Sequence, residues 1–197
     1  AGGAVINAFA AQLGASVTVV DVGVAADLPD LPGLLHHKIA YGTTDLSQGP
    51  AMTREQAVAA LEVGITVAER LIGAGHRCLI GGDMGIANTT ASAALICAFT
   101  GREPAEATGR GTGIDDATYA RKVAVVRRAL QVNGLPGRSP LETLAAVGGL
   151  EHAALAGLIL GAAAARVPVI LDGVIAGAAA LAAAAAAPDA IGYCVAG

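Results

Sequence analysis

Three short apolar runs of the sequence each end in an aspartate with glycine close by, at Asp21, Asp83 and Asp172. Runs this short and apolar fit strands that are buried on both faces, as parallel sheets require. Ligands of open parallel sheets bind beyond the carboxyl ends of the strands, so we expect the three carboxylates to line one crevice. An Asp-Gly ending also occurs where the aspartate only caps the next helix, and for Asp21 and Asp172 both interpretations stand equally.

The residues after Asp83 indicate an anion site. Glycines flank the turn and a polar cluster then begins a helix of small residues, which gives the candidate ligand-binding positions Gly85, Asn88, Thr89 and Thr90. Unpaired N–H groups at a helix N-terminus, joined by hydroxyl groups, suit a phosphate. The sequence has no Gly-x4-Gly-Lys-Ser/Thr motif, which excludes a triphosphate P-loop. The alternative is that Asn88 or Thr89 merely caps the helix.

A second glycine-rich turn, residues 109–113, comes just before a helix that carries four basic residues: Arg121, Lys122, Arg127 and Arg128. The turn does not follow an apolar strand, which argues against a dinucleotide fingerprint. Basic residues on a helix most often form a solvated face, and we expect this of two or three of the four. One of them could reach an anion held by the turn, and the sequence alone does not say which.

The composition excludes several classes of protein. The 197 residues carry 12 Lys and Arg against 16 Asp and Glu, a net charge of −4, with three Tyr, two Phe and no Trp. This mildly acidic chain lacks the clusters of basic residues and the aromatic side chains for base stacking that nucleic-acid binders use. Its hydrophobic content of 54% excludes disorder.

The cysteines and histidines predict neither a disulfide framework nor a metal site. Cys78, Cys97 and Cys194 are odd in number and contain no Cys-x-x-Cys pair, which indicates a reduced, cytoplasmic protein. No spacing of histidines and carboxylates matches a metal-ligand pattern. His152, near a predicted helix start, is expected to be a cap or a surface residue.

An alanine-rich region over residues 153–187 raises the question of a membrane span. Arg166, Pro168 and Asp172 divide it into two pieces, each shorter than the 20 or so apolar residues that cross a bilayer. We therefore expect two buried helices and no membrane association.

Segments with helical spacing lie between the apolar runs and predict helices over residues 53–74, 115–132, 150–165 and 174–187. The first opens with a capping box of Thr53 and Gln56, and a last apolar run predicts a strand over residues 190–195. Strands alternating with helices predict an α/β fold of three layers, with a mostly parallel, Rossmann-like sheet and helices on both faces, in a single core domain over residues 1–197. The small side chains of the helices favour close approach of backbones. Residues 23–50 form an irregular stretch that is longer than an ordinary connection between elements, and loops of this length are usually functional or mobile.

Several motifs, in the same order along essentially the whole chain, resemble a known family: the nicotinate-nucleotide–dimethylbenzimidazole phosphoribosyltransferases of cobalamin lower-ligand synthesis. The motif Gly82-Asp83-Met84-Gly85-Ile86-Ala87-Asn88-Thr89-Thr90 carries the likeness most strongly. It is joined by the segments 1–7, 19–23, 49–53, 109–113, 122–129, 147–151 and 169–173. Several motifs in the same order identify a family far more specifically than any single glycine turn does.

The resemblance implies transfer of 5-phosphoribosyl from nicotinate mononucleotide to 5,6-dimethylbenzimidazole, which releases nicotinate and forms α-ribazole 5′-phosphate. It implies that Gly85, Gly111 and Lys122 hold the nucleotide phosphate. It also implies that the carboxylate at Asp83 lies near the ribose and the attacking base. Further substrate-binding positions are Asn88, Thr89, Thr90, Gly109 and Asp172. The resemblance implies a homodimer that requires no metal and no cofactor, because nicotinate is already a positively charged leaving group.

The sequence departs from the family pattern at three positions of the first motif. Asp83 is shorter than the common Glu, Ala87 replaces a usual Gly, and Ala91 replaces a usual Pro. The family's principal general base, a Glu in a Gly-Glu-Gly segment, is expected beyond residue 197. Residues of the benzimidazole pocket and the family's small helical domain are likewise expected to be missing or incomplete here.

Two alternative functions stay open. The first is a catalytically impaired nucleotide-binding fragment or module that lacks the C-terminal general base, so that it binds the phosphate end without efficient turnover. The second is a dinucleotide-dependent oxidoreductase, which we rank last because no glycine fingerprint follows the first strand.

Overall fold

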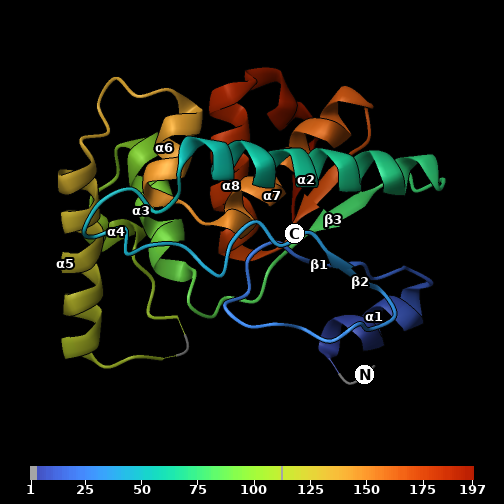
Figure 1. The fold of residues 1–197 in the computed structure, drawn as a ribbon, viewed down its shortest axis with the longest axis horizontal. Coiled ribbons are helices and arrows are strands. Elements are labelled where there is room, and N and C mark those ends of the chain that lie inside the picture. The colour runs from blue at the N-terminus through green and yellow to red at the C-terminus, as the bar shows by residue number, and fades with distance from the viewer. Residues whose placement is uncertain (1–3, 112) are drawn as a thin grey trace.

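The computed structural model describes residues 4–111 and 113–197, so residues 1–3 and Thr112 of the predicted motifs lie outside the described residues. Figure 1 shows the order of the elements along the chain. They are α1 (Val5–Leu13), β1 (Val19–Asp21), β2 (Leu34–His36), α2 (Arg54–Gly73), β3 (Leu79–Gly81), α3 (Thr89–Thr100), α4 (Pro104–Ala107), α5 (Asp116–Asn133), α6 (Pro140–Val147), α7 (Leu150–Ala164), β4 (Val169–Leu171), α8 (Gly173–Ala186), the 3-10 helix η1 (Pro188–Tyr193) and β5 (Cys194–Ala196).

The strands are parallel and form two hydrogen-bonded sheets. One has three strands in the order β3-β4-β5, with Ile80, Ile170 and Val195 side by side in register. The other pairs β1 with β2, with Val20 opposite Leu35. The predicted α/β fold, with parallel strands flanked by helices, is confirmed.

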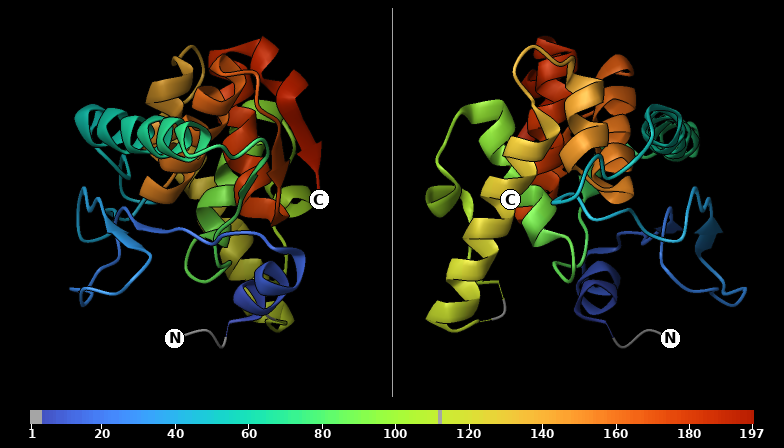
Figure 2. Two further views of the ribbon diagram at one scale, coloured as in Figure 1. Left: turned by 90° about the vertical axis from the view of Figure 1, so that its right-hand side faces the viewer. Right: turned by 60° about the vertical axis from the view of Figure 1, so that its left-hand side comes forward.

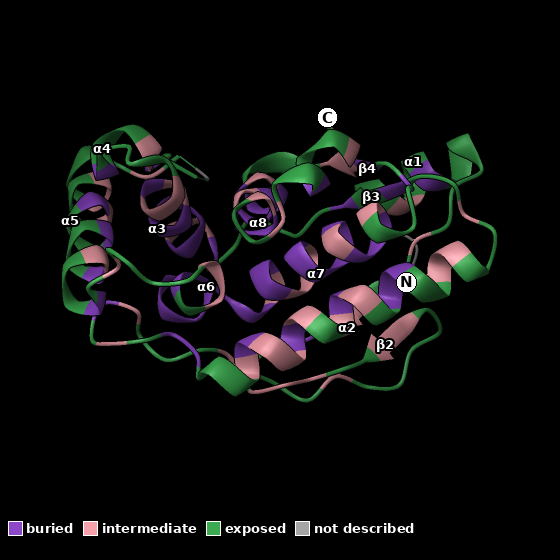
Figure 3. Cartoon of the chain, turned by 90° about the horizontal axis from the view of Figure 1, so that it is seen from above, coloured by how far each residue is buried: buried purple, intermediate pink, exposed green. Residues whose placement is uncertain are grey.

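The helices pack in a row beside the strands. Helix α2 packs along α7, α7 against α8, α8 against α3, and α3 against α5. Seen from above in Figure 3, α7 and α8 are largely buried, whereas α5 at the far end of the row turns an exposed side to solvent. Helix α1 lies apart from this row in Figure 1 and in the right-hand view of Figure 2. The core therefore centres on α7 and α8, the region whose composition raised the question of a membrane span. Within the described residues, no helix combines the length and the apolar character that a membrane span needs.

The closest helix packing depends on glycine. A Cβ atom at Gly64 of α2 would overlap the carbonyl oxygen of Ala154, and one at Gly157 of α7 would overlap the carbonyl oxygen of Leu61. The two backbones therefore touch where they cross, and no larger residue fits at either position. The prediction that small side chains allow close backbone approach is confirmed for this pair.

Local sequence signals place most helix boundaries. Thr53 and Gln56 form the predicted capping box at the start of α2, and Asp115 caps α5 by accepting a hydrogen bond from the Thr118 backbone at 2.7 Å. A second capping box, Ser139 with Glu142, starts α6, which the sequence analysis did not predict. Helices α1 and α4 and strand β2 were not predicted either. The strand predicted over residues 190–195 is confined to β5, because η1 occupies Pro188–Tyr193.

Candidate active site

The turn after β3 and the end of β4 lie next to each other at the carboxyl edge of the three-stranded sheet. The backbone N–H of Asp172 donates to the carbonyl of Gly81 at 3.0 Å. A Cβ atom at Gly82 would lie 3.3 Å from Oδ2 of Asp172, so the bare backbone of Gly82 leaves room for that side chain. Asp172 holds the N-cap position of α8 without a side-chain hydrogen bond to the helix. The structure thus brings Asp83 and Asp172 to one edge of the sheet.

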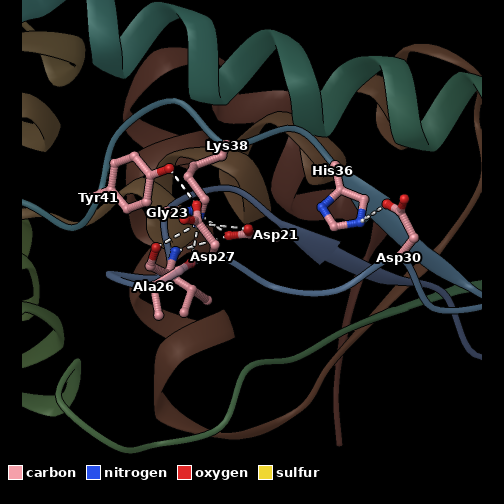
Figure 4. A network of polar contacts seen from close by, with 9 residues as sticks. Asp21, Gly23, Ala26, Asp27, Asp30, His36, Lys38 and Tyr41 are labelled. Carbon is pink, nitrogen blue, oxygen red and sulfur yellow. Dashed lines mark hydrogen bonds and ion pairs between the residues drawn. The ribbon is translucent and has the colours of Figure 1, made fainter.

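Asp21 lies in the other sheet, so the prediction that all three aspartates line one crevice is wrong for this residue. Its side chain is fully buried, and one carboxylate oxygen lies 2.7 Å from Nζ of Lys38 (Figure 4). The other oxygen accepts hydrogen bonds from the backbone N–H groups of Gly23 and Val24. Burial acts to raise the pKa of Asp21, but the hydrogen bonds from Lys38 and the backbone outweigh it and hold the pKa below its usual value. Every oxygen of this carboxylate is occupied by the protein itself.

Lys38 fixes the start of the long connection between β1 and α2. Its Nζ donates to the carbonyl oxygens of Val24 and Ala26, and it lies 4.9 Å from the centre of the Tyr41 ring. The Tyr41 hydroxyl in turn donates to Asp27 (Figure 4). Lys38 therefore ties the middle of the stretch predicted as irregular to its beginning, and the stretch contains β2.

The N-terminus of α3 carries a set of backbone N–H groups that Asn88 does not cap. Asn88 stands at the N-cap position, but its side-chain amide donates to Oδ1 of Asp83 at 2.9 Å and to the carbonyl of Met84 at 3.0 Å. The alternative that Asn88 merely caps the helix is therefore wrong. Ala87, just before it, has φ 68°, a left-handed conformation that favours glycine.

Lys122 is the basic residue of α5 that reaches this helix terminus. Its Nζ donates to Oγ1 of Thr89 at 2.8 Å and to the carbonyl of Gly109 at 3.1 Å. Partial burial lowers the pKa of Lys122. An ammonium group has three N–H donors, so these two acceptors leave one donor for a ligand. The structure therefore brings together Thr89, Gly109 and Lys122, which come from three separate motifs.

The neighbouring basic residues have other partners. Arg128 donates to the carbonyl of Ser47 at 3.0 Å, and Arg121 donates to the hydroxyl of Thr118 at 2.9 Å. Arg110, within the glycine turn, pairs with Asp116 and lies 5.1 Å from the centre of the Tyr119 ring. The turn itself uses left-handed backbone at Gly111 and Gly113, with φ of 56° and 97°, which explains its glycines.

Asp83 lies close to a second carboxylate, Glu151 at the start of α7. Loss of hydration raises the pKa of Asp83, and the charge of Glu151 adds to this rise. His152 and the hydrogen bond from Asn88 act in the opposite direction. A carboxylate with a raised pKa is a better proton acceptor than an ordinary aspartate, which is the property of a general base.

His152 is fully buried, so the expectation of a cap or surface residue is wrong. Its Nε2 lies 2.8 Å from Oγ of Ser92, and its Nδ1 lies 2.8 Å from Oε1 of Glu151, close but poorly aligned for a hydrogen bond. Burial acts to raise the pKa of Glu151, yet contact with His152 outweighs it and the pKa is lowered. The helical spacing of His152 with Ala156 and Ile159, both buried, is the sequence signal that places the histidine on the inner face.

The rest of the described structure contains no metal cluster but has an open cavity away from this region. Within residues 4–111 and 113–197, no group of three or more His, Cys, Asp or Glu side chains is arranged to hold a metal ion. An open cavity of about 710 Å³ lies at the other end of α3, and the residues that line it include Cys97, Phe99, Leu130 and Leu135. None of the predicted site residues borders that cavity.

Comparison with known proteins gives one consistent result. A family model described as "Phosphoribosyltransferase" matches residues 1–197. The chain is 59% identical over 196 residues to a nicotinate-nucleotide–dimethylbenzimidazole phosphoribosyltransferase of Chloroflexus aggregans, and 58% identical over 211 residues to that of Salinispora tropica. Each alignment covers 100% of this chain but 56% and 58% of the relatives, so the chain spans little more than half their length.

A solved structure agrees with these relatives. The crystal structure of CobT from Thermus thermophilus superposes with a TM-score of 0.94 at 46% identity. The superposition covers 99% of this chain and 58% of that one.

Proposed function

Because this chain belongs to the phosphoribosyltransferase family, we propose that the protein transfers 5-phosphoribosyl from nicotinate mononucleotide to 5,6-dimethylbenzimidazole, and that residues 1–197 form its nucleotide-binding domain. The products are α-ribazole 5′-phosphate and nicotinate, as a step of cobalamin lower-ligand synthesis. The observation that carries the proposal is the contact of Lys122 with both Thr89 and Gly109, because it brings three predicted motifs together around one ammonium group.

In this proposal the phosphate of the mononucleotide binds at the N-terminus of α3. Its oxygens accept hydrogen bonds from backbone N–H groups of the first turn and of Gly85, and from the Lys122 donor that has no acceptor among the described residues. Gly109 and Gly111 of the second glycine turn close the site from the side of α5. Backbone N–H groups and an ammonium group hold a phosphate by charge and direction, without a metal ion.

The reaction replaces one C–N bond by another. A ring nitrogen of the benzimidazole forms a bond to C1′ of the ribose while the bond from C1′ to nicotinate breaks, and the electron pair of the broken bond neutralises the nicotinate ring. The N–H proton of the benzimidazole must leave as the new bond forms. The barrier is therefore mainly one of positioning and deprotonation. Asp83 lies at the edge of the site, where a carboxylate supports the positive charge that develops on the ribose.

The test is the reaction itself, in the natural protein that contains these residues. We expect nicotinate release from nicotinate mononucleotide to depend on added dimethylbenzimidazole, with one α-ribazole 5′-phosphate formed per nicotinate. Nicotinate release at the same rate without the base, or no release in either case, would contradict the proposal. Calorimetric titration with the mononucleotide separates a binding module from an enzyme, because a module binds without forming product.

We favour the enzyme over the nucleotide-binding module, because the relatives that match the whole of this chain are named as transferases. We also expect a cytoplasmic homodimer, and sedimentation analysis of the purified protein checks the oligomeric state.

A further inference from the structure

A continuous series of polar contacts connects Asp83 to the interior of the protein. Asn88 donates to Asp83 at 2.9 Å, and the backbone carbonyl of Asn88 accepts from the Ser92 hydroxyl at 3.1 Å. Ser92 lies 2.8 Å from Nε2 of His152, whose Nδ1 lies 2.8 Å from Glu151. The series begins at the mouth of the candidate site and ends at the first turn of α7.

The hydrogen-bond directions along this series place a proton on Nε2 of His152. A carbonyl oxygen can only accept, so the single hydroxyl proton of Ser92 points to Asn88. The Nε2 atom of His152 must then donate to Ser92, while Nδ1 faces the carboxylate of Glu151. The fully buried ring therefore lies between Ser92 and Glu151, with Nε2 as its donor to Ser92.

The charges around Asp83 come from several elements. Helix α7 contributes Glu151 and His152, the end of β4 contributes Asp172 beside Gly82, and α5 contributes Lys122 through Thr89. The charge of Glu151 raises the pKa of Asp83, and His152 acts in the opposite direction. Gly149 preserves the arrangement, because a Cβ atom there would collide with the carboxylate of Glu151.

We propose that Glu151 and His152 are positioning residues for Asp83: acting through Ser92 and Asn88, and through their own charges, they fix the place and the ionisation of its carboxylate. The proposal deepens the proposed function and rests on it for its role in catalysis. The coupling between the three side chains is a property of the protein alone and can be measured without substrate.

The first test follows the titration of the Asp83 carboxyl carbon by NMR in the full natural protein without ligand. Glu151→Gln should lower the midpoint, because the repelling charge is gone. His152→Gln should raise it, because the side chain that lowers the pKa of Asp83 is gone while a donor to Ser92 is kept. Glu62→Gln, which removes an exposed carboxylate from α2, is the matched control and should leave the midpoint unchanged. An unchanged midpoint in Glu151→Gln would overturn the proposal. Because Glu151 is partly exposed, we expect Glu151→Gln to fold even if His152→Gln does not.

The second test separates positioning from mere support of the fold. In the transfer reaction, Glu151→Gln should lower kcat by about 10- to 100-fold, less than the 10²–10⁴-fold expected for the group that transfers the proton. KM for nicotinate mononucleotide should stay within about twofold of the natural value, because the phosphate contacts are untouched, and the acid limb of the pH profile should move to lower pH with the titration midpoint. A fall in kcat accompanied by an equal rise in KM, with no shift of the acid limb, would contradict a positioning role. Natural protein that shows no transfer would refute the proposed function, while the NMR shifts would still decide the coupling.

Discussion

Nζ of Lys122 and Oγ1 of Thr89 lie 2.8 Å apart, although 33 residues separate them in the chain. The contact joins α5 to the first residue of α3 and, through the carbonyl of Gly109, to the glycine turn between them. The two sequence features that separately indicated an anion site therefore lie in contact with each other.

Lys122→Ala should weaken binding of nicotinate mononucleotide by about 1.5–3 kcal/mol, the range of a hydrogen bond to a charged group. The physical reason is the loss of the ammonium group that contacts the first residue of α3. Titration calorimetry measures the effect. Arg127→Ala, which removes an exposed cation from the same helix, is the control and should bind normally. The same Kd in both variants would remove Lys122 from the site.

The buried Asp21 carboxylate should make folding stability depend on pH. Its pKa in the folded protein lies below the value near 3.9 of an unfolded aspartate. Its contribution to stability is therefore complete above the unfolded pKa and is lost as the pH falls through the lower folded pKa. Urea unfolding of the natural protein and of Asp21→Asn checks this. The difference in unfolding free energy between them should be large at pH 6 and should shrink below about pH 4. A difference that is constant with pH would show that the charge on Asp21 contributes nothing.

Gly157→Ala should destabilise the protein by about 3 kcal/mol or more, because the added methyl group overlaps the α2 backbone at Leu61. Gly177 provides the matched control, since it lies inside α8 with nothing within 4 Å of an added Cβ atom. Gly177→Ala should stabilise by about 0.5–1 kcal/mol, the ordinary helix preference for alanine. Thermal unfolding of the two variants measures both effects, and a loss of similar size at Gly177 would mean that the α2–α7 contact is not special.

Ala87→Gly should stabilise the protein slightly, by about 0.5–1 kcal/mol. A left-handed alanine costs roughly 1–2 kcal/mol, and glycine removes that strain while losing part of the gain to the entropy of the unfolded chain. Chemical unfolding measures the difference. A loss of stability in Ala87→Gly would show that the strain at this turn is compensated by contacts of the methyl group.

Many of the local elements were predictable because their causes lie within a few residues. Thr53 and Gln56 start α2, Asp115 starts α5, and three apolar runs contain the strands β1, β3 and β4. The elements that were missed have weaker local signals: β2 is three residues inside a turn-rich stretch, and α4 is a single turn. The boundary of β5 was wrong because apolar residues after Pro188 fit a 3-10 helix as well as a strand.

The features of the candidate site also divide into those that the sequence predicted and those that only the structure revealed. The sequence by itself determined the elements of the candidate anion site, because a glycine turn followed by hydroxyl residues at a helix start has the same geometry in any fold. Only the tertiary structure decided that Lys122 is the cation that reaches them, that Asp21 is occupied by Lys38, and that His152 is buried against Ser92, 60 residues away. Such partners depend on which segments the packing of α2, α3, α5, α7 and α8 brings together, and no spacing along the chain contains that information.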